Sequence, residues 1–387
     1  MMKEKILKYW IALKAVEGVG CVGFRTLLAA FGSPEAVFRA SALTLQCLPG
    51  IGPKTADEIL TFSDWEKAEQ EIARTETLGV SIVTCQDPLY PRNLLNIYDY
   101  PPFLYVKGSL RPEEIGVAIV GSRLASTYGK YVTEKLSREL ALKGITVVSG
   151  LARGIDSAAH RGALAGKGRT IAVLGSGLDV VYPLENEALA ADITAQGALL
   201  TEYPFGTPPN APNFPARNRL ISGVSLGVVV VEAGEKSGSL ITARIASDQG
   251  RSVFAVPGAI ESAGSRGTNR LIKQGAKLIE NVEDILEEII PQAGLPPVVP
   301  ERPSLFSAPG AMPDDGEKET APFPTAGKGL GETETRLLSF ITQEPVGVDT
   351  LIARSGLTAH EVQSGLLVLA LGGIIRQLPG KMFLRKE

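Results

Sequence analysis

One pattern constrains the fold of this chain more than any other: between residues 80 and 290, short β-branched runs alternate with stretches of helical periodicity. In the helix expected at 128–143, for example, Val132 and Leu136 fall on one face. Such alternation builds β-α-β units, which form a parallel sheet covered by helices on both faces. The sequence therefore predicts a Rossmann-like, doubly wound and mostly parallel α/β sheet. Strands are expected at 81–84, 103–107, 116–120, 146–149, 171–174, 198–201, 228–231, 253–256 and 277–279.

The segment before this region contains an internal repeat. Gly18-Val-Gly20 corresponds to Gly50-Ile-Gly52 at an offset of 32 residues, and each copy has the order helix, Gly-x-Gly turn, helix. Glycines allow a tight turn and a close approach to a phosphate at the start of the next helix. Residues 1–79 are therefore predicted to form a helix-hairpin-helix (SAM-like) domain. Whether that domain binds DNA or only packs is left open.

The C-terminal part changes character twice. Residues 291–331 lack periodicity and are rich in proline and charge, which predicts a linker. Residues 332–387 follow with helices at 334–342, 348–355 and 358–371 and a strand pair at 374–378 and 382–385, the order of a winged helix. The expected recognition segment 359–373 contains no Lys or Arg, so protein docking is favoured over regulation of duplex DNA.

The composition disfavours several classes of function. The formal charge of −3 confines any nucleic-acid site to a local patch. Three cysteines without a C-x-x-C pair and two histidines predict no disulfide framework, no metal site and a reducing compartment. There is neither a signal peptide pattern nor an apolar run of membrane-spanning length. We therefore expect a cytoplasmic protein without a membrane partner or a cofactor.

Candidate binding residues follow the expected strands, because ligands of open α/β sheets bind beyond the carboxyl ends of the strands. The strand at 116–120 is followed by Gly121, Ser122 and Arg123, and Ser126 can cap the next helix. Backbone amides, a hydroxyl and a guanidinium at a helix start form an anion site. Another strand end adds further small and hydroxyl groups: Ser237, Gly238 and Ser239.

An aromatic residue lies beside two arginines between two of the expected strands. This stretch contains Phe214, Arg217, Asn218 and Arg219. An aromatic ring next to guanidinium groups suits a base stacked above a track of phosphates. These residues complete a predicted site for single-stranded DNA.

Catalytic interpretations have less support in the sequence. Asp156 and His160 are four residues apart on an expected helix, where an aspartate commonly caps and a histidine commonly packs. There is no G-x-S-x-G elbow, no Walker sequence and no dinucleotide fingerprint. We therefore predict a protein without catalytic residues.

Several long motifs resemble one family. The segments IVGSR (119–123), SGLARGIDSAAH (149–160), FPARNRLISG (214–223) and VEAGEKSGSLITAR (231–244) are similar to DNA-processing protein A, also called DprA or Smf, and the likeness spans 87–286. The resemblance implies protection of incoming single strands during natural transformation, loading of the recombinase RecA, and homodimer formation. It places DNA contacts at the 121–123 loop and around Phe214, Arg217 and Arg219.

One departure from that family concerns a phosphate contact. Several relatives have Lys or Arg where this chain has Leu184 and Glu185. The contact is then either missing or supplied by Lys167 or Arg169. An alternative to the whole interpretation is a nucleotide-binding phosphoribohydrolase-like enzyme, because 231–244 echoes a loop of those enzymes. That chemistry would need a general acid near Arg244, where the sequence has none.

Overall fold

The computed structural model describes residues 2–111, 113–294, 332–342, 346–358, 361–362, 364–366, 369, 374–378 and 382–385. The chain divides into two compact units, Met1–Arg302 and Pro303–Glu387, and each is described by itself. The linker predicted at 291–331 lies outside the described residues from 295 onward. Its first two residues belong instead to the last helix of the larger unit, α13 (Val282–Gln292).

The larger unit begins with six helices: α1 (Met2–Ala15), α2 (Cys21–Phe31), α3 (Pro34–Phe38), α4 (Ala42–Gln46), α5 (Pro53–Leu60) and α6 (Trp65–Leu78). The two predicted Gly-x-Gly turns precede α2 and α5. Gly18 and Gly50 have φ of 86° and 80°, a region that favours glycine. Gly20 and Gly52 then occupy the N-cap positions of the two helices. The predicted helix-hairpin-helix repeat is confirmed.

A nine-stranded sheet follows, in the order β1-β2-β6-β5-β4-β3-β7-β8-β9. The strands β1, β2 and β6 pair antiparallel, and all other pairs are parallel. The predicted mostly parallel sheet is confirmed, with the end of every strand within one residue of its expected position. The strands are β1 (Val80–Thr84), β2 (Phe103–Gly108), β3 (Gly116–Val120), β4 (Thr146–Ser149), β5 (Thr170–Val173), β6 (Ala198–Thr201), β7 (Gly227–Val230), β8 (Ser252–Ala255) and β9 (Lys277–Leu278).

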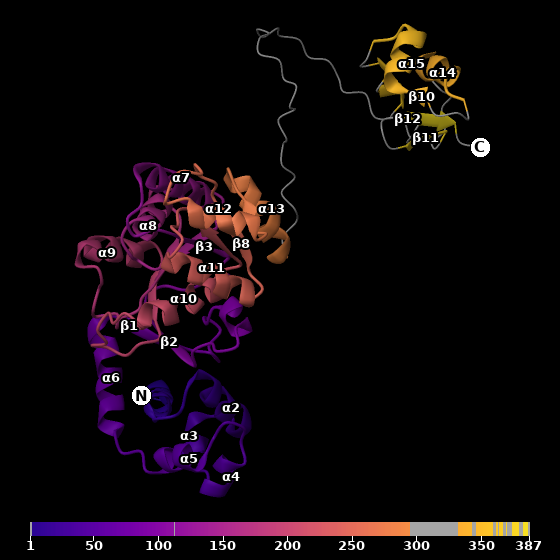
Figure 1. Ribbon diagram of the computed structural model, residues 1–387. Coiled ribbons are helices and arrows are strands. Elements are labelled where there is room, and N and C mark those ends of the chain that lie inside the picture. The colour runs from indigo at the N-terminus through magenta and orange to yellow at the C-terminus, as the bar shows by residue number, and fades with distance from the viewer. Residues whose placement is uncertain are drawn as a thin grey trace. The chain divides into compact units, whose positions relative to one another are not determined.

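Helices cover both faces of this sheet (Figure 1). On one face Val117 and Ile119 of β3 pack in a core with α7, α8 and α13, and on the other Ala118 and Val120 pack with α10 and α11. This alternation follows from the two-residue period of a strand. The remaining helical bounds are α7 (Thr127–Leu142), α8 (Ile155–Ala165), α9 (Glu187–Gln196), α10 (Asn213–Val224), α11 (Gly238–Asp248), α12 (Arg266–Lys273), with 3₁₀ turns at Arg92–Asn96 and Leu184–Asn186.

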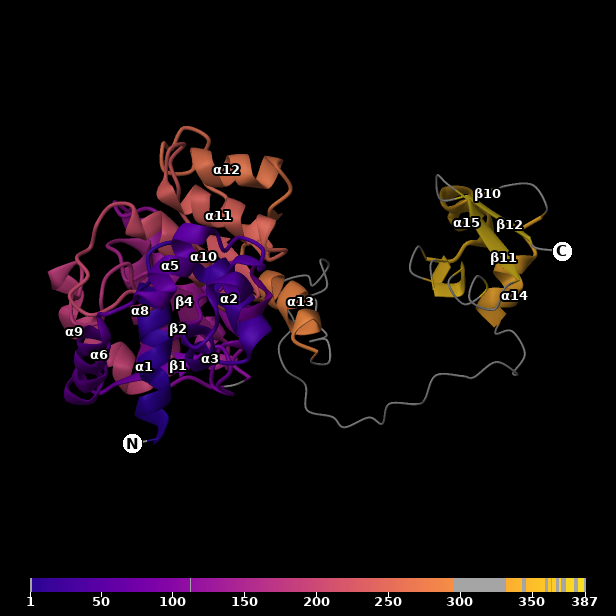
Figure 2. The same ribbon diagram turned by 90° about the horizontal axis from the view of Figure 1, so that it is seen from below.

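The N-terminal helices pack against the antiparallel edge of the sheet. Seen from below, α1, α2 and α3 lie in front of β1 and β2 (Figure 2). One continuous core joins Trp10 and Phe24 of the helices to Phe103 and Tyr105 of β2. Burial of these aromatic rings stabilises the contact, since each removes a large apolar area from water. The helical domain and the sheet therefore share one core.

The smaller unit contains α14 (Glu332–Leu338), β10 (Val346–Gly347), α15 (Val348–Ser355), β11 (Ile375–Leu378) and β12 (Met382–Arg385). Its strands form an antiparallel sheet in the order β10-β12-β11 around a core that includes Leu351 and Phe383. This is the predicted winged helix. The sequence pattern missed the two-residue strand β10. Within the helix expected at 358–371, the described residues 361–362, 364–366 and 369 are helical. Among the described helices of the chain, none has the length and apolar character that crossing a bilayer requires.

Candidate nucleic-acid interface

A cleft of about 850 Å³ opens where the strand order reverses. From β3 the chain proceeds to β4 on one side and later resumes at β7 on the other, so the loops after β3 and β7 diverge. Ligands of open α/β sheets bind at such a position. Nine of the predicted residues line this cleft: Gly121, Ser122, Arg123, Phe214, Arg217, Asn218, Ser237, Gly238 and Ser239.

The loop after β3 requires glycine at its first position. A Cβ atom on Gly121 would lie 2.6 Å from Cγ1 of Ile155 and 2.9 Å from the carbonyl oxygen of Glu232. The next amide, of Ser122, donates a 2.7 Å hydrogen bond to that same carbonyl. The loop is thereby held against the end of β7, and Arg123 projects from it with an exposed side chain.

Ser126 holds the loop and does not line the cleft. Its hydroxyl caps α7 by accepting from the Gly129 amide at 2.9 Å, and it donates to Oε2 of Glu232 at 2.9 Å. The Ser126 amide donates to the same Oε2 at 3.0 Å. The predicted capping role is confirmed. Because the single hydroxyl proton is used within the protein, the structure does not present Ser126 to DNA. Glu232, which the sequence reasoning missed, ties this loop to β7.

Arg123 and Phe214 meet at the mouth of the cleft. The guanidinium carbon of Arg123 lies 5.2 Å from the centre of the Phe214 ring. A third group, Tyr182, places its ring 5.8 Å from that of Phe214 and is 46% exposed. A positive charge over an aromatic face is attracted by the ring quadrupole, so this pair is held together before any ligand arrives. The mouth thus combines a cation with two flat apolar surfaces.

Arg217 forms the floor of the cleft and is only 3% exposed. Its Nη1 donates to the carbonyl of Gly150 at 2.8 Å and to that of Val173, which joins α10 to the ends of β4 and β5. Burial lowers the pKa of Arg217 to about 10. Nη1 is thereby engaged beneath the surface, while Nε has no hydrogen-bond partner among the residues that the structure describes, so the phosphate contact predicted for Arg217 stays a prediction.

A buried carboxyl group balances this arginine. Asp156 is 7% exposed and accepts hydrogen bonds from the amides of Gly150 at 3.1 Å and Ala152 at 3.4 Å. Burial raises the pKa of Asp156, and the nearby charge of Arg217 opposes that rise. As the sequence suggested, this aspartate satisfies backbone donors around a helix start.

Arg219 lies on the other side of α10 from the cleft. Its Nη2 donates to both carboxylate oxygens of Glu202 at 2.6 Å, and its Nη1 to the carbonyl of Asp99 at 2.8 Å. Residues two apart on a helix point about 200° apart, so Arg217 and Arg219 cannot follow one phosphate track. In contrast, Phe214 and Arg217 are three apart and share a face. The structure therefore does not bring Arg219 to the predicted site.

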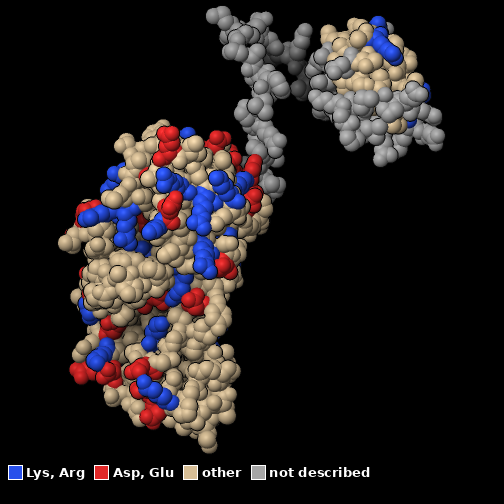
Figure 3. Space-filling model, viewed as in Figure 1, with Lys and Arg blue, Asp and Glu red and all other residues tan. Residues whose placement is uncertain are grey.

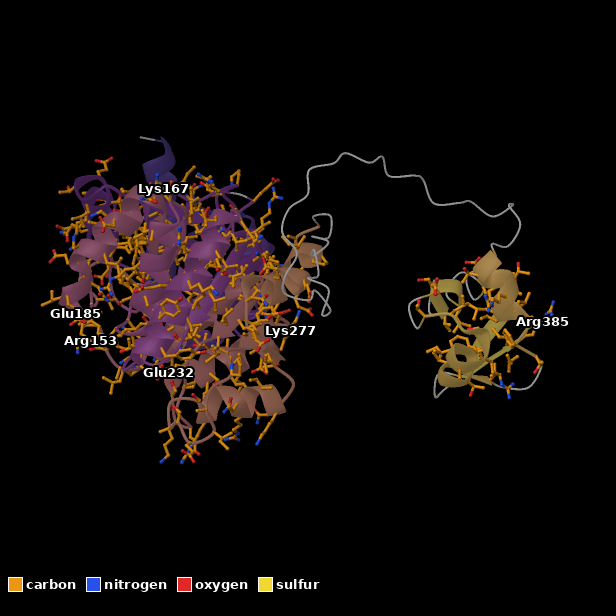
Figure 4. All side chains as sticks on the ribbon, turned by 90° about the horizontal axis from the view of Figure 1, so that it is seen from above. Arg153, Lys167, Glu185, Glu232, Lys277 and Arg385 are labelled. Atoms are coloured by element: carbon orange, nitrogen blue, oxygen red, sulfur yellow. The ribbon has the colours of Figure 1, made fainter. Side chains whose placement is uncertain are left out.

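Lys167 and Arg169 lie at the opposite edge of the sheet. They precede β5, and so they stand at the amino ends of the parallel strands. Arg169 is 14% exposed, forms a 2.5 Å ion pair with Glu114 and donates to the carbonyl of Ser109 at 2.7 Å. In Figure 4, Lys167 lies well apart from Glu232. Neither residue can supply a phosphate contact to the cleft, which corrects that expectation.

The positions where relatives have a basic residue are occupied differently here. Leu184 is 79% exposed, and Glu185 forms a 2.9 Å ion pair with Arg153. Both members of this pair are labelled side by side in Figure 4. Arg153 thus brings a guanidinium to the region in which the sequence lacked one, although Glu185 neutralises its charge.

His160 is packed as the sequence suggested. It is fully buried, and its Nδ1 lies 2.7 Å from Oγ1 of Thr170. Burial lowers the pKa of His160 to about 3, so the imidazole is neutral at physiological pH. Across the described parts of the chain, no group of three or more His, Cys, Asp or Glu side chains could hold a metal ion.

Two basic residues near the hairpins of the helix-hairpin-helix domain are engaged within the protein. Lys54 forms a 2.7 Å ion pair with Glu17, on the surface. Arg25 donates to the carbonyl of Tyr98 at 2.8 Å and lies 5.3 Å from the centre of its ring. Neither hairpin therefore presents an uncommitted cation at these positions.

Positive charge gathers around the sheet instead. Figure 3 shows Lys and Arg side chains concentrated over the upper part of the larger unit, where α7, α8, α11 and α12 lie in Figure 1. The start of α11 also faces the cleft: Ser237 is its N-cap, and the Ser237 and Ser239 hydroxyls are 2.7 Å apart. A helix N-terminus favours anions, since its amides lack intrahelical partners.

Comparison with known proteins agrees with this geometry. Residues 81–290 match the family model described as DNA recombination-mediator protein A, 321–381 match the DprA winged helix domain, and 11–62 match a SAM-like helix-hairpin-helix tandem. The chain is 35% identical over 395 residues to protein Smf of Synechocystis sp., covering 98% of each. It is 41% identical to protein Smf of Escherichia coli, covering 86% of this chain and 84% of that one.

A solved structure is similar as well. The X-ray structure of DNA processing protein A (DprA) from Streptococcus pneumoniae aligns with a TM-score of 0.64 and 37% identity, covering 73% of this chain and 98% of that one. The family model at 81–290 covers all nine strands of the large sheet apart from Val80, the first residue of β1. The chain therefore belongs to the DNA recombination-mediator protein A family, also called the DprA/Smf family.

Proposed function

We propose that this chain binds single-stranded DNA in the cleft at the carboxyl edge of the sheet. The observation that carries the proposal is the guanidinium of Arg123 held 5.2 Å from the ring centre of Phe214 at the cleft mouth. A base can stack on the aromatic face while the guanidinium binds an adjacent phosphate through paired hydrogen bonds. The amides at the start of α11 provide a second anion-binding position.

Single strands fit this arrangement better than duplexes. Stacking on Phe214 or Tyr182 needs a base whose flat face is exposed, and a duplex hides those faces between neighbouring pairs. Reading a duplex would instead require a helix or ribbon that carries donors into the major groove. The aromatic residues at the cleft mouth favour the single strand.

The family to which the chain belongs suggests its wider role in the cell. We propose that the chain protects incoming single strands and loads RecA onto them during natural transformation, acting in the cytoplasm as a homodimer. The names of its relatives, DNA processing protein and DNA recombination-mediator protein, support a role in that pathway. In this proposal residues 80–290 bind the strand, while 1–79 and 332–387, joined through 291–331, serve contacts with protein or additional DNA.

The proposed function is tested by titrating labelled single- and double-stranded DNA of equal length and composition against the full chain. We expect much tighter binding of the single strand, little dependence on sequence and a steep loss of affinity as salt rises. Equal affinity for both forms, or affinity that salt leaves unchanged, would contradict the proposal.

A nucleotide-cleaving activity has weaker support in the same cleft. Of the carboxyl groups near the strand ends, Asp156 is held by two backbone amides and Glu232 by Ser126. We propose that the protein acts without catalysis. Release of free base from nucleoside monophosphates by the purified chain would refute this, and loss of that release in Asp156→Asn would assign it to the cleft.

A further inference from the structure

The exposed face of α7 carries aromatic and basic side chains that the cleft does not use. Tyr128 is 62% and Tyr131 66% exposed, although tyrosine rings usually lose most of their area to packing. The two are three residues apart and so lie roughly 4.5 Å apart along the helix axis, on neighbouring positions of one face. Two exposed rings at this spacing form a surface on which flat groups can stack.

Positive charge continues along the same face. Lys135 and Arg138 follow Tyr131 by four and seven residues, which places them on the same side of the helix. Both are exposed. Lys135 approaches Glu139 at 4.0 Å, and within the described part of the chain no ion pair involves Arg138. The face thus carries two aromatic side chains followed by two basic ones, and the exposed Glu134 borders it.

The face begins a few residues after the cleft in the chain. Arg123 and Leu124 line the cleft, and Leu124 is 91% exposed. Ser126 then caps α7, which brings Tyr128 into the first turn of the helix directly beyond the loop. We therefore expect a strand that leaves the cleft over Arg123 to reach Tyr128 and Tyr131 next.

We propose that the α7 face, defined by Tyr128, Tyr131, Lys135 and Arg138, binds the continuation of the single strand held in the cleft. This inference rests on the proposed function and adds a second segment to the site. Bases stack on the two tyrosines, and phosphates approach the two cations. The occupant is a polyanion with exposed aromatic faces, because adjacent rings and cations match that chemistry. A second protein chain is the competing occupant.

The test measures affinity as a function of strand length. Oligothymidylates from about 4 to about 24 nucleotides, a range that brackets known site sizes, are titrated against the full chain and against Tyr128→Ala/Tyr131→Ala. For the shortest strands that bind, we expect affinities within twofold of the wild type, since these fit the cleft alone. For the longest strands we expect roughly a tenfold loss, because stacking on the α7 face is absent.

Two further variants serve as controls for this experiment. Tyr98→Ala removes a tyrosine that is 74% exposed outside the α7 face, and we expect it to bind every length as the wild type does. Lys135→Glu/Arg138→Glu keeps both tyrosines, and we expect the same loss for long strands together with a shallower salt dependence. Melting curves verify that each variant is folded.

Several outcomes would overturn the inference. An equal loss at all lengths would place the tyrosines in the cleft's own function, and unchanged binding at all lengths would remove the α7 face from the strand's path. Unchanged DNA binding with altered self-association in sedimentation would assign the face to a second protein chain. If the wild type binds no single strand of any length, the proposed function itself fails, which is a distinct result.

Discussion

The two edges of the central sheet use arginine in opposite ways. At the carboxyl edge, Arg123 is exposed at the cleft mouth beside Phe214, and none of the described residues forms an ion pair with it. At the amino edge, Arg169 is 14% exposed and bound to Glu114 and to the carbonyl of Ser109. The residue type is the same, but the groups that surround each guanidinium differ.

The hydrogen-bond acceptors around each arginine determine whether it stabilises the fold or can bind a ligand. The amino edge offers a carboxylate and free carbonyls, which satisfy Arg169 and leave no charge for a ligand. At the carboxyl edge the carboxylates of Asp156 and Glu232 already accept from backbone amides or from Ser126, and neither forms an ion pair with Arg123. The charge of Arg123 is therefore left for an anion from outside the protein. Arg217 lies at the same edge but beneath its surface, where two carbonyls accept from its Nη1.

The largest expected effect is a loss of stability when Arg217, at the floor of the cleft, is replaced. Replacing Arg217 with methionine removes the donors to Gly150 and Val173 and leaves Asp156 without its balancing charge. We expect the free energy of unfolding to fall by roughly 3–5 kcal/mol, as for other broken buried pairs. Denaturant unfolding measures this, with Asn218→Ala as a control that lines the same cleft. A fully stable Arg217→Met that has lost DNA binding would return this arginine to the phosphate track.

Replacing Arg169 at the amino edge should lower stability and leave DNA binding unchanged. Arg169→Met leaves Glu114, which is 10% exposed, without its partner, so we expect a loss of about 3 kcal/mol in unfolding free energy. The affinity for single strands and its salt dependence should not change. Lys167→Met is the matched control and should alter stability by less than about 0.5 kcal/mol. A weaker DNA affinity in the folded Arg169→Met would break the distinction between the edges.

The free energy of unfolding should depend on pH through His160, which is buried in the core. The pKa of His160 is lowered to about 3 in the folded protein from an ordinary 6.5, so the unfolded chain binds the proton more tightly. The stability from neutral His160 is present above about pH 6.5 and is lost as the pH falls toward 3. From about pH 7 to about pH 5, the free energy of unfolding should drop by about 2 kcal/mol through this residue.

The variant His160→Asn isolates that contribution. Asp156, whose pKa is raised, acts in the opposite sense but is present in both proteins. Unfolding curves at both pH values give the difference. If the wild type and the variant lose the same stability over this interval, His160 is not responsible for the acid response.

The smallest effects are expected at the cleft mouth, in binding and not in stability. Phe214→Ala should weaken single-strand binding about tenfold, within the range for one stacked base, and leave the salt slope unchanged. Arg123→Ala should weaken binding and reduce that slope by about 0.7, one phosphate's share for a single strand. Titrations at several salt concentrations distinguish them. Identical slopes in the wild type and Arg123→Ala would remove this arginine from phosphate binding.

Much of this protein could be predicted from local patterns. The short β-branched runs between helical stretches predicted the nine strands, and the paired glycines predicted the turns before α2 and α5. Ligands of open α/β sheets bind beyond the carboxyl ends of the strands, and the residues predicted on that basis include Gly121, Arg123 and Ser237. These residues and Phe214 line one cleft. These features depend on backbone geometry and on burial of short segments, which neighbouring residues encode.

Tertiary structure decided the roles of the remaining charged residues. Arg217, Arg219 and Arg169 have the same side chain. Each donates to different acceptors, which come from distant segments of the chain. Glu232 and Tyr182 joined the site only because β7 and the loop after β5 fold beside β3 and α10. A charged side chain is satisfied by whatever partner the fold brings within about 3 Å, and sequence spacing does not specify that partner.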